Sequence, residues 1–210
     1  MNITIAAATP FEIREEVYTN TLHRIQFLYT GIGVLSSAIS FMQHVFQHKP
    51  DLIIQAGIAG SFDTNIKLGN VVVIEKEYLG DTGVWEGGEW KDLFDMNLQK
   101  SDEQPFTNRS LPNKQADKLN KLHLPKVTGV TINEITTSEQ RMKVLTEKYK
   151  ADVESMEGAS LHYVCNLFSV SFIQLRAISN YVGERDKTKW EMKDSIANVN
   201  EAARKTIAAF

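Results

Sequence analysis

The sequence predicts an α/β fold in which a mixed, mostly parallel central sheet is flanked by helices on both faces. Short apolar runs, several of them rich in β-branched residues, alternate with longer segments of helical periodicity along the chain. The apolar runs are also almost continuously hydrophobic. This pattern is typical of strands covered on both sides, and strands with one solvated face alternate instead.

Composition supports one globular domain over residues 1–210 and argues against several kinds of partner. The chain has 210 residues, 42% hydrophobic and 23% charged, which is enough for a sizeable core. The net charge is −3 and the Lys and Arg residues are scattered, so a nucleic-acid partner is not expected. Cys165 is the only cysteine and the histidines lack ligand spacing, so we expect no metal and no cofactor.

Neither a signal peptide nor a membrane span is predicted. The chain begins Met-Asn-Ile-Thr-Ile-Ala without a basic leader, and with a single cysteine a cytoplasmic location fits best. Residues 25–46 contain no Asp, Glu, Lys or Arg, which raises the question of a membrane helix. The same segment contains two glycines and several Ser and Gln residues, so a strand, a turn and a helix are favoured there.

The first elements are a strand at residues 3–8, ended by a proline, and a strand at residues 25–29. The turn Thr30-Gly31-Ile32-Gly33 follows and leads into a helix. Backbone amides at such a helix start can cradle an anion, although a tight turn without a ligand is the alternative. The buried face of this helix is predicted to carry Leu35, Ala38, Ile39, Met42, Val45 and Phe46.

A third strand at residues 52–55 is expected to end in a second glycine turn, residues 56–61, where a ligand could approach the backbone. Residues 71–74 are β-branched and predict an interior strand. The pattern then thins as far as residue 126, with a short helix predicted at 113–121. Three aromatic residues in this segment, Trp85, Trp90 and Phe94, are expected to pack over the sheet rim or against another subunit.

The carboxyl-terminal half alternates between strands and helices. Strands are predicted at 127–132, 152–156 and 172–178, and helices at 138–148, from Glu157 onward, and at 191–209. Ser138 is expected to cap the first of these helices. Cys165 falls on the buried stripe of the second helix, so we expect it to be a small core residue and not a nucleophile.

Two polar residues, Glu157 and Asn180, stand where buried elements stop. Glu157 closes the run Val-Glu-Ser-Met-Glu, and Asn180 closes Arg-Ala-Ile-Ser-Asn. Ligands of parallel α/β sheets bind just beyond the carboxyl ends of the strands, so the two residues define a candidate site. A helix-starting glutamate and a turn asparagine are the alternative interpretations.

Several segments together resemble the nucleoside phosphorylase and nucleosidase superfamily. They are residues 5–12, the glycine turns at 30–33 and 56–60, and the runs 153–157 and 176–180. The resemblance spans nearly the whole chain and implies a nucleoside phosphorylase-like fold. It also implies a purine nucleoside substrate and a homodimer or higher homo-oligomer.

Within the superfamily, residues 176–186 followed by Trp190 are most similar to the futalosine hydrolases. That resemblance implies hydrolysis of futalosine to hypoxanthine and dehypoxanthine futalosine, a step of menaquinone biosynthesis. The methylthioadenosine/S-adenosylhomocysteine nucleosidases are also similar, but they carry Asp where this chain has Asn180.

The resemblance also implies roles for individual residues. Loss of a purine from ribose passes through a cationic sugar. Glu12 would activate water, Glu157 would bind the ribose hydroxyls and favour the positive charge, and Asn180 would donate a hydrogen bond to purine N7 or a 6-oxo group.

The further implied substrate contacts are Gly33, Gly57, Ala59 and Gly60 in the glycine turns, Ile135 on the purine face, Met156 under the ribose, and Arg185 at the aryl carboxylate of futalosine. Core packing for Ile135 and Met156, and a solvated pair of Arg185 with Asp186, are the alternatives.

Other activities of the same superfamily are less favoured. Phosphate would need arginines beside the glycine turns, and neither turn has one next to it in the sequence, so water is the expected nucleophile. A methylthioadenosine/S-adenosylhomocysteine-type or other purine nucleosidase is the main alternative. A purine nucleoside phosphorylase is less favoured, and so is a non-catalytic nucleoside-binding domain, since Glu12 and Glu157 are both present.

Overall fold

The computed structural model describes residues 1–19 and 21–210. Its strands are β1 (Asn2–Ala7), β2 (Arg24–Tyr29), β3 (Leu52–Ser61), β4 (Val71–Leu79), β5 (Gly83–Glu86), β6 (Glu89–Asp92), β7 (Leu111–Pro112), β8 (Lys126–Thr131), β9 (Val153–Ser155) and β10 (Phe172–Tyr181). Its α-helices are α1 (Val34–His48), α2 (Ala116–Leu119), α3 (Glu139–Lys148), α4 (Gly158–Phe168) and α5 (Met192–Ala208). No helix in the described part of the chain has the length and hydropathy needed to cross a bilayer.

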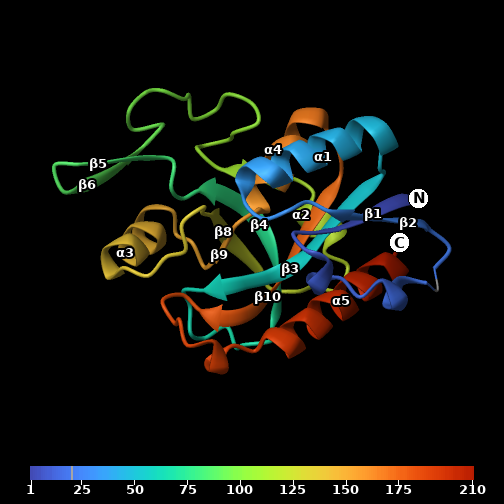
Figure 1. Cartoon of the computed structure of the whole chain (residues 1–210). Coiled ribbons are helices and arrows are strands. Elements are labelled where there is room, and N and C mark those ends of the chain that lie inside the picture. Colours follow the sequence, from blue (N-terminus) through green and yellow to red (C-terminus); the bar gives the residue numbers. More distant parts are fainter. Residues whose placement is uncertain (20) are drawn as a thin grey trace.

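One mixed sheet organises these elements (Figure 1). Strands β3, β10, β4, β8 and β9 pair in a closed ring, and β1 and β2 extend the sheet outward from β3. The pairings of β10 with β4, β3 with β9 and β4 with β7 are antiparallel, and the other pairings in this sheet are parallel. The predicted α/β fold with a mixed sheet is therefore confirmed. The partial closure was not predicted, and the antiparallel pairings mean that the sheet is not clearly mostly parallel.

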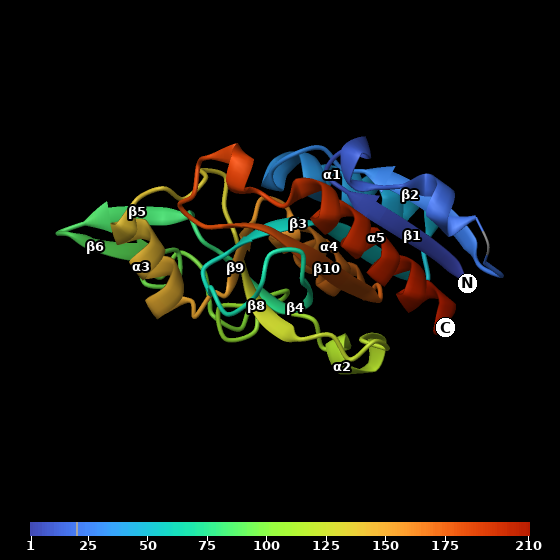
Figure 2. The same cartoon turned by 90° about the horizontal axis from the view of Figure 1, so that it is seen from below.

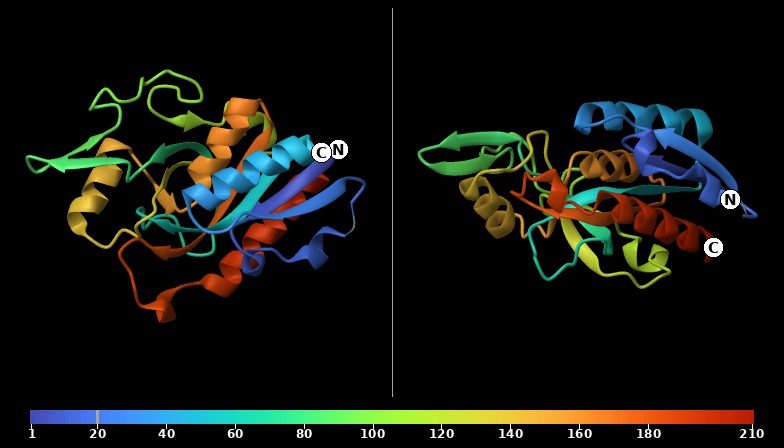
Figure 3. Two further views of the ribbon diagram at one scale, coloured as in Figure 1. Left: turned by 45° about the horizontal axis from the view of Figure 1, so that its top comes forward. Right: turned by 60° about the horizontal axis from the view of Figure 1, so that its bottom comes forward.

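Helices cover both faces of the sheet, as predicted (Figure 3). Ile5, Ile54 and Leu175 lie on the side that packs against α5. Their neighbours Ala6 and Ile53 point the other way and pack with α1 and α4. Because side chains alternate along a strand, one continuously apolar run can serve two helical layers.

Helix α1 buries a face that shares only Val45 with the predicted one, and the predicted Leu35, Ile39, Met42 and Phe46 are exposed. Its buried residues are Ser37, Phe41, His44 and Val45. The two polar side chains of this face are satisfied inside the protein. Ser37 donates to the Gly31 carbonyl at 3.1 Å, and His44 Nε2 hydrogen-bonds with Thr4 Oγ1 at 2.7 Å. The buried face was predicted from the spacing of apolar residues, and that spacing cannot identify a buried face that is partly polar.

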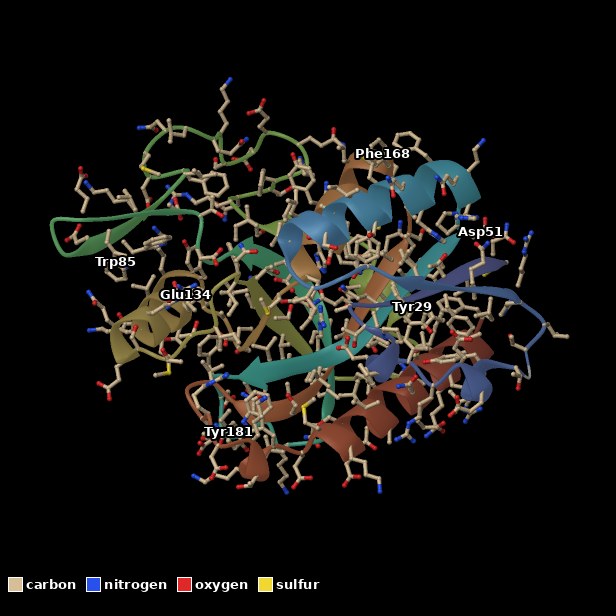
Figure 4. All side chains as sticks on the ribbon, viewed as in Figure 1. Tyr29, Asp51, Trp85, Glu134, Phe168 and Tyr181 are labelled. Atoms are coloured by element: carbon tan, nitrogen blue, oxygen red, sulfur yellow. The ribbon has the colours of Figure 1, made fainter. Side chains whose placement is uncertain are left out.

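The opposite side of the helix is an apolar surface, which we call the exposed α1 face. It consists of Leu35, Ile39, Met42 and Phe46, with Leu35 75% exposed and Phe46 61% exposed. Phe46 also contacts Phe168 of α4, with 4.9 Å between ring centroids, and Phe168 lies beside α1 in Figure 4.

The second predicted glycine turn is not a turn, because β3 continues through residues 56–61. Gly57 is needed there for a different reason. A Cβ at this position would lie 2.5 Å from Arg176 Nη1 and 2.9 Å from Glu12 Oε1. The glycine therefore makes room for two charged side chains, whereas Gly31 and Gly33 do occupy the predicted turn with φ of +78° and +88°.

The thin segment after β4 contains the hairpin β5–β6, which projects away from the end of the molecule that carries both termini (Figure 2). Trp85 lies on this hairpin and is 42% exposed (Figure 4). Trp90 donates from Nε1 to the Tyr149 hydroxyl at 2.8 Å, and Phe94 packs on Phe106. Trp90 and Phe94 are therefore packed within the chain.

Two local predictions in the carboxyl-terminal half are confirmed. Ser138 caps α3, its side chain accepting a hydrogen bond from the Arg141 backbone N–H. Cys165 is 1% exposed and lies in the core between α1 and α4. Burial raises the pKa of its thiol far above the usual range, as expected for a packing residue.

Candidate active site

A cavity of about 440 Å³ is lined by residues that end or follow β1, β3, β8, β9 and β10. The predicted site residues among its lining are Glu12, Ala59, Gly60, Ile135, Met156, Glu157, Asn180 and Arg185. These residues are up to 173 positions apart in the chain (185 − 12), and the strand order brings them together. The predicted residues Gly33 and Gly57 lie behind this lining, against the carboxylates of Glu157 and Glu12.

Glu12 ends a short 3₁₀ turn, Pro10–Glu12, that follows β1. Its Oε2 accepts a hydrogen bond from the Thr9 backbone N–H at 3.1 Å, and its Oε1 accepts one from the Ile58 N–H in β3 at 3.3 Å. Charge-assisted bonds from two separate elements hold the carboxylate in one position. A carboxylate has about four acceptor sites, so Glu12 can still bind a proton or a water molecule.

Glu157 immediately precedes α4, at the N-cap position, and it is 5% exposed. Its Oε1 accepts a hydrogen bond from the Gly33 N–H at 3.2 Å, and its Oε2 lies 3.7 Å from Arg176 Nη2. The anion that the turn at residues 31–33 binds through its backbone N–H is therefore a side chain of the protein itself, the Glu157 carboxylate. Burial raises the pKa of Glu157, and the Arg176 charge and the Gly33 N–H oppose that rise.

Arg176 does not line the cavity but supports Glu157 from behind it, and no role was predicted for it from the sequence. It is 2% exposed, lies opposite Gly57 in the pairing of β10 with β3, and donates from Nη1 to the Ile58 carbonyl at 3.3 Å. Its Nε and Nη2 have no hydrogen-bond partner among the described residues. No arginine is next to the glycine segments in the sequence. In the folded protein, however, Arg176 lies beside one of them, so the expectation that no arginine adjoins them is wrong. A charged residue inside the apolar run 172–178 was the available signal.

Asn180 reaches the cavity because β10 is irregular there. The register with β3 shifts between Ile178 and Asn180, a bulge that sets Asn180 opposite Gly60. The strand also continues through Tyr181, beyond its predicted end at residue 178, so Asn180 lies within the strand and not in a turn after it. Its Oδ1 accepts from the Ser179 hydroxyl at 2.8 Å and its Nδ2 donates to the Tyr181 carbonyl at 3.1 Å. One amide hydrogen remains for a ligand.

The rest of the cavity wall is mainly apolar and includes Phe11, Ile32, Ile135 and Met192. Arg185 lies at this wall with its guanidinium 5.6 Å from the ring centroid of Trp190, a cation–π arrangement.

The predicted alternative for Arg185, an ion pair with Asp186, is not formed within the described residues. Asp186 instead accepts a hydrogen bond from the Thr188 N–H at 3.0 Å. The described residues also contain no group of three or more His, Cys, Asp or Glu side chains placed to hold a metal ion.

Comparison with known proteins agrees with this architecture. The family model described as the phosphorylase superfamily matches residues 4–210. A futalosine hydrolase of Thermus thermophilus is 27% identical over 183 residues, covering 87% of this chain and 80% of that protein. A 5'-methylthioadenosine/S-adenosylhomocysteine nucleosidase of Bacillus velezensis is 28% identical over 170 residues, covering 78% and 71%.

The fold is also similar to solved structures. A 5'-methylthioadenosine/S-adenosylhomocysteine nucleosidase of Helicobacter pylori superposes with a TM-score of 0.84 at 18% identity, covering 100% of this chain and 99% of the other. At this identity the similarity concerns the fold. Both kinds of nucleosidase are similar to this chain to nearly the same degree.

Proposed function

Because the chain belongs to the phosphorylase superfamily and its relatives are nucleosidases, it is an N-glycosyl hydrolase, and we propose that it hydrolyses futalosine to hypoxanthine and dehypoxanthine futalosine. One observation carries the proposal. Two carboxylates and one carboxamide, from Glu12, Glu157 and Asn180, face a single cavity of about 440 Å³. This volume falls in the range of small-molecule sites.

The two acids suit the two halves of glycosidic cleavage. As the bond from C1' to purine N9 breaks, its electron pair leaves with the purine and the sugar becomes cationic. Glu157 would accept hydrogen bonds from the ribose hydroxyls, and its negative charge would stabilise the cation. Glu12 would accept a proton from the attacking water, whose oxygen then bonds to C1'. The purine anion takes up its proton from solvent, because the Asn180 amide cannot supply one.

The charges around the cavity favour water over phosphate as the nucleophile. Arg176 is the buried cation nearest to Glu157, at 3.7 Å, and Glu12 Oε1 approaches the same glycine, Gly57. An incoming phosphate dianion would meet both carboxylates, and this repulsion would exceed what one already paired guanidinium offers. Neutral water meets no such barrier.

Two features support a 6-oxopurine with an extended substituent on the sugar. The free amide hydrogen of Asn180 can bond N7 or a 6-oxo oxygen, and an amide cannot protonate the base as a carboxylic acid would. At the apolar wall, Arg185 offers a cation for an aryl carboxylate beside the Trp190 ring. A methylthioadenosine-type nucleosidase is the second candidate, because Phe11 and Ile32 could equally contact a thioalkyl group.

The purified protein is expected to release hypoxanthine from futalosine in phosphate-free buffer, with methylthioadenosine and inosine as poorer substrates. Chromatographic separation of free bases measures all three reactions. Faster release of adenine from methylthioadenosine would select the second candidate. Release that depends on added phosphate would contradict hydrolysis.

We also propose that the chain forms a homo-oligomer through the exposed α1 face. The face is apolar, and the helix that packs beside it, α4, also exposes Tyr163 and Leu167, at 39% and 42%. Ile32, immediately before α1, is 61% exposed and also lines the cavity, so a second copy on this face would sit at the cavity mouth.

The double variant Leu35→Glu/Phe46→Glu is expected to be monomeric by light scattering, because two charges cannot be buried in an apolar contact without partners. Leu98→Glu is the matched control, since Leu98 is 71% exposed in a different segment. The control should keep the wild-type mass. A wild-type protein that is monomeric at micromolar concentration would contradict the proposal.

A further inference from the structure

Glu154 is a buried acid in the cavity wall that the mechanism above does not use. It lies in β9 opposite Gly60 of β3, and it is 8% exposed. Its Oε2 has no hydrogen-bond partner among the described residues. An unpartnered buried carboxylate oxygen is costly. Because Glu154 is a lining residue of the cavity, a ligand there can bond its carboxylate.

Glu154 and Asn180 flank the same point in the cavity wall. A Cβ placed on Gly60 would lie 3.4 Å from Asn180 Nδ2 and 3.6 Å from Glu154 Cγ. The missing Gly60 side chain therefore leaves a space with an amide donor on one side and a carboxylate acceptor on the other. A planar ring placed over Gly60 would present its edge to both groups.

On the basis of the nucleosidase function proposed above, we propose that Glu154 and Asn180 together select a 6-oxopurine. The Glu154 carboxylate accepts a hydrogen bond from N1–H of the base, and Asn180 Nδ2 donates to the 6-oxo oxygen. A 6-aminopurine has the reverse polarity, with an acceptor at N1 and a donor at the 6-position. It would place two acceptors face to face at Glu154 and two donors at Asn180.

The surroundings of Glu154 make this selection dependent on pH. Burial raises the pKa of Glu154 to about 7, and contacts with Thr136 and the charges of Arg141 in α3 and Arg185 after β10 oppose the rise. Neither arginine forms an ion pair with Glu154 within the described residues, and Arg141 pairs instead with Asp81 and Glu134. Below about pH 7 the neutral acid can donate to the N1 acceptor of adenine. Above it, only the acceptor form remains, so discrimination against adenine should increase.

Calorimetric titration of hypoxanthine and adenine into the full chain tests the inference without requiring turnover. For the wild type, the ratio of Kd for adenine to Kd for hypoxanthine should rise about tenfold between pH 6 and pH 8, following ionisation near pH 7. Glu154→Gln should lower this ratio about tenfold at pH 8 and remove its pH dependence, because an amide can present a donor to adenine N1.

Glu147→Gln is the matched control, because Glu147 lies on α3 with its side chain 65% exposed. It should behave as the wild type does. A Glu154→Gln protein with the wild-type ratio and pH slope would overturn the inference, as would failure of the wild type to bind either base. If the variant does not fold, a wild type that binds adenine as tightly as hypoxanthine at pH 8 is sufficient to reject it. If the wild type binds both bases but cleaves no nucleoside, the proposed function is rejected. The binding data then still decide the role of Glu154.

Discussion

Glu157→Gln is expected to lower kcat about 100- to 1000-fold, the size of effect typical for loss of one preorganised electrostatic contact. The amide keeps the shape of the side chain and can still accept the Gly33 N–H bond, but it carries no charge to stabilise a cationic sugar. The loss should therefore fall mainly on kcat and less on KM. Steady-state release of base from futalosine, or from methylthioadenosine if that is the better substrate, measures both constants.

Two comparisons keep this result interpretable. Thermal unfolding should show that Glu157→Gln remains folded, and Glu147→Gln, exposed on α3, should retain wild-type kcat. A folded Glu157→Gln protein within about threefold of wild-type kcat would remove Glu157 from the reaction, since that difference is below the effect expected from any direct contact.

Arg176→Met is expected to lower the free energy of unfolding at pH 8 by about 3–5 kcal/mol, the usual effect of removing one partner of a buried ion pair. Arg176 lies 3.7 Å from Glu157 and also opposes the raised pKa of Glu77. Glu77 is 1% exposed and accepts hydrogen bonds from Thr131 Oγ1 and Gln174 Nε2, both at 2.9 Å. Removal of the guanidinium leaves these buried carboxylates without their cation.

The deficit should shrink as pH falls, and the sign follows from the pKa directions. Burial raises the pKa of Glu77 from its usual value of about 4.5 to about 7, so its favourable contribution is complete below about pH 4.5 and is lost as pH rises through about 7. Without Arg176 the pKa values of Glu77 and Glu157 rise further, which extends that loss to higher pH. Urea unfolding at pH 5 and pH 8 measures the difference.

Arg204→Met is the matched control for this experiment. Arg204 is 44% exposed on α5 and pairs with Glu201 at the surface, so its loss should change stability by less than about 1 kcal/mol at either pH. An Arg176→Met deficit as large at pH 5 as at pH 8 would show that lost packing, and not the uncompensated carboxylates, accounts for the destabilisation.

Sequence patterns were informative wherever the determining interaction was local. The Ser138 cap, the turn at Gly31 and Gly33 and the buried Cys165 each depend on residues within one element, and each was predicted. The positions of Glu157 and Asn180 near element ends also sufficed to expect these two residues at one site, because carboxyl ends of neighbouring strands lie together, whereas Glu12 was expected there only from the family resemblance. Their catalytic roles remain predictions.

Pairing between distant segments decided the rest. Gly57 lies in a strand because β3 pairs with β10 beyond the predicted turn, and it is a glycine because Arg176, opposite it on β10, needs the space of a side chain. Helix α1 buries Ser37 and His44 because Thr4 and the Gly31 carbonyl accept or share their hydrogen bonds. Glu154 and Asn180 flank Gly60 because of the antiparallel contact of β9 with β3 and the bulge in β10. Periodicity reports which residues share a face of one element. Only the register between elements determines which charges and polar groups meet, and that register is set by the folded chain as a whole.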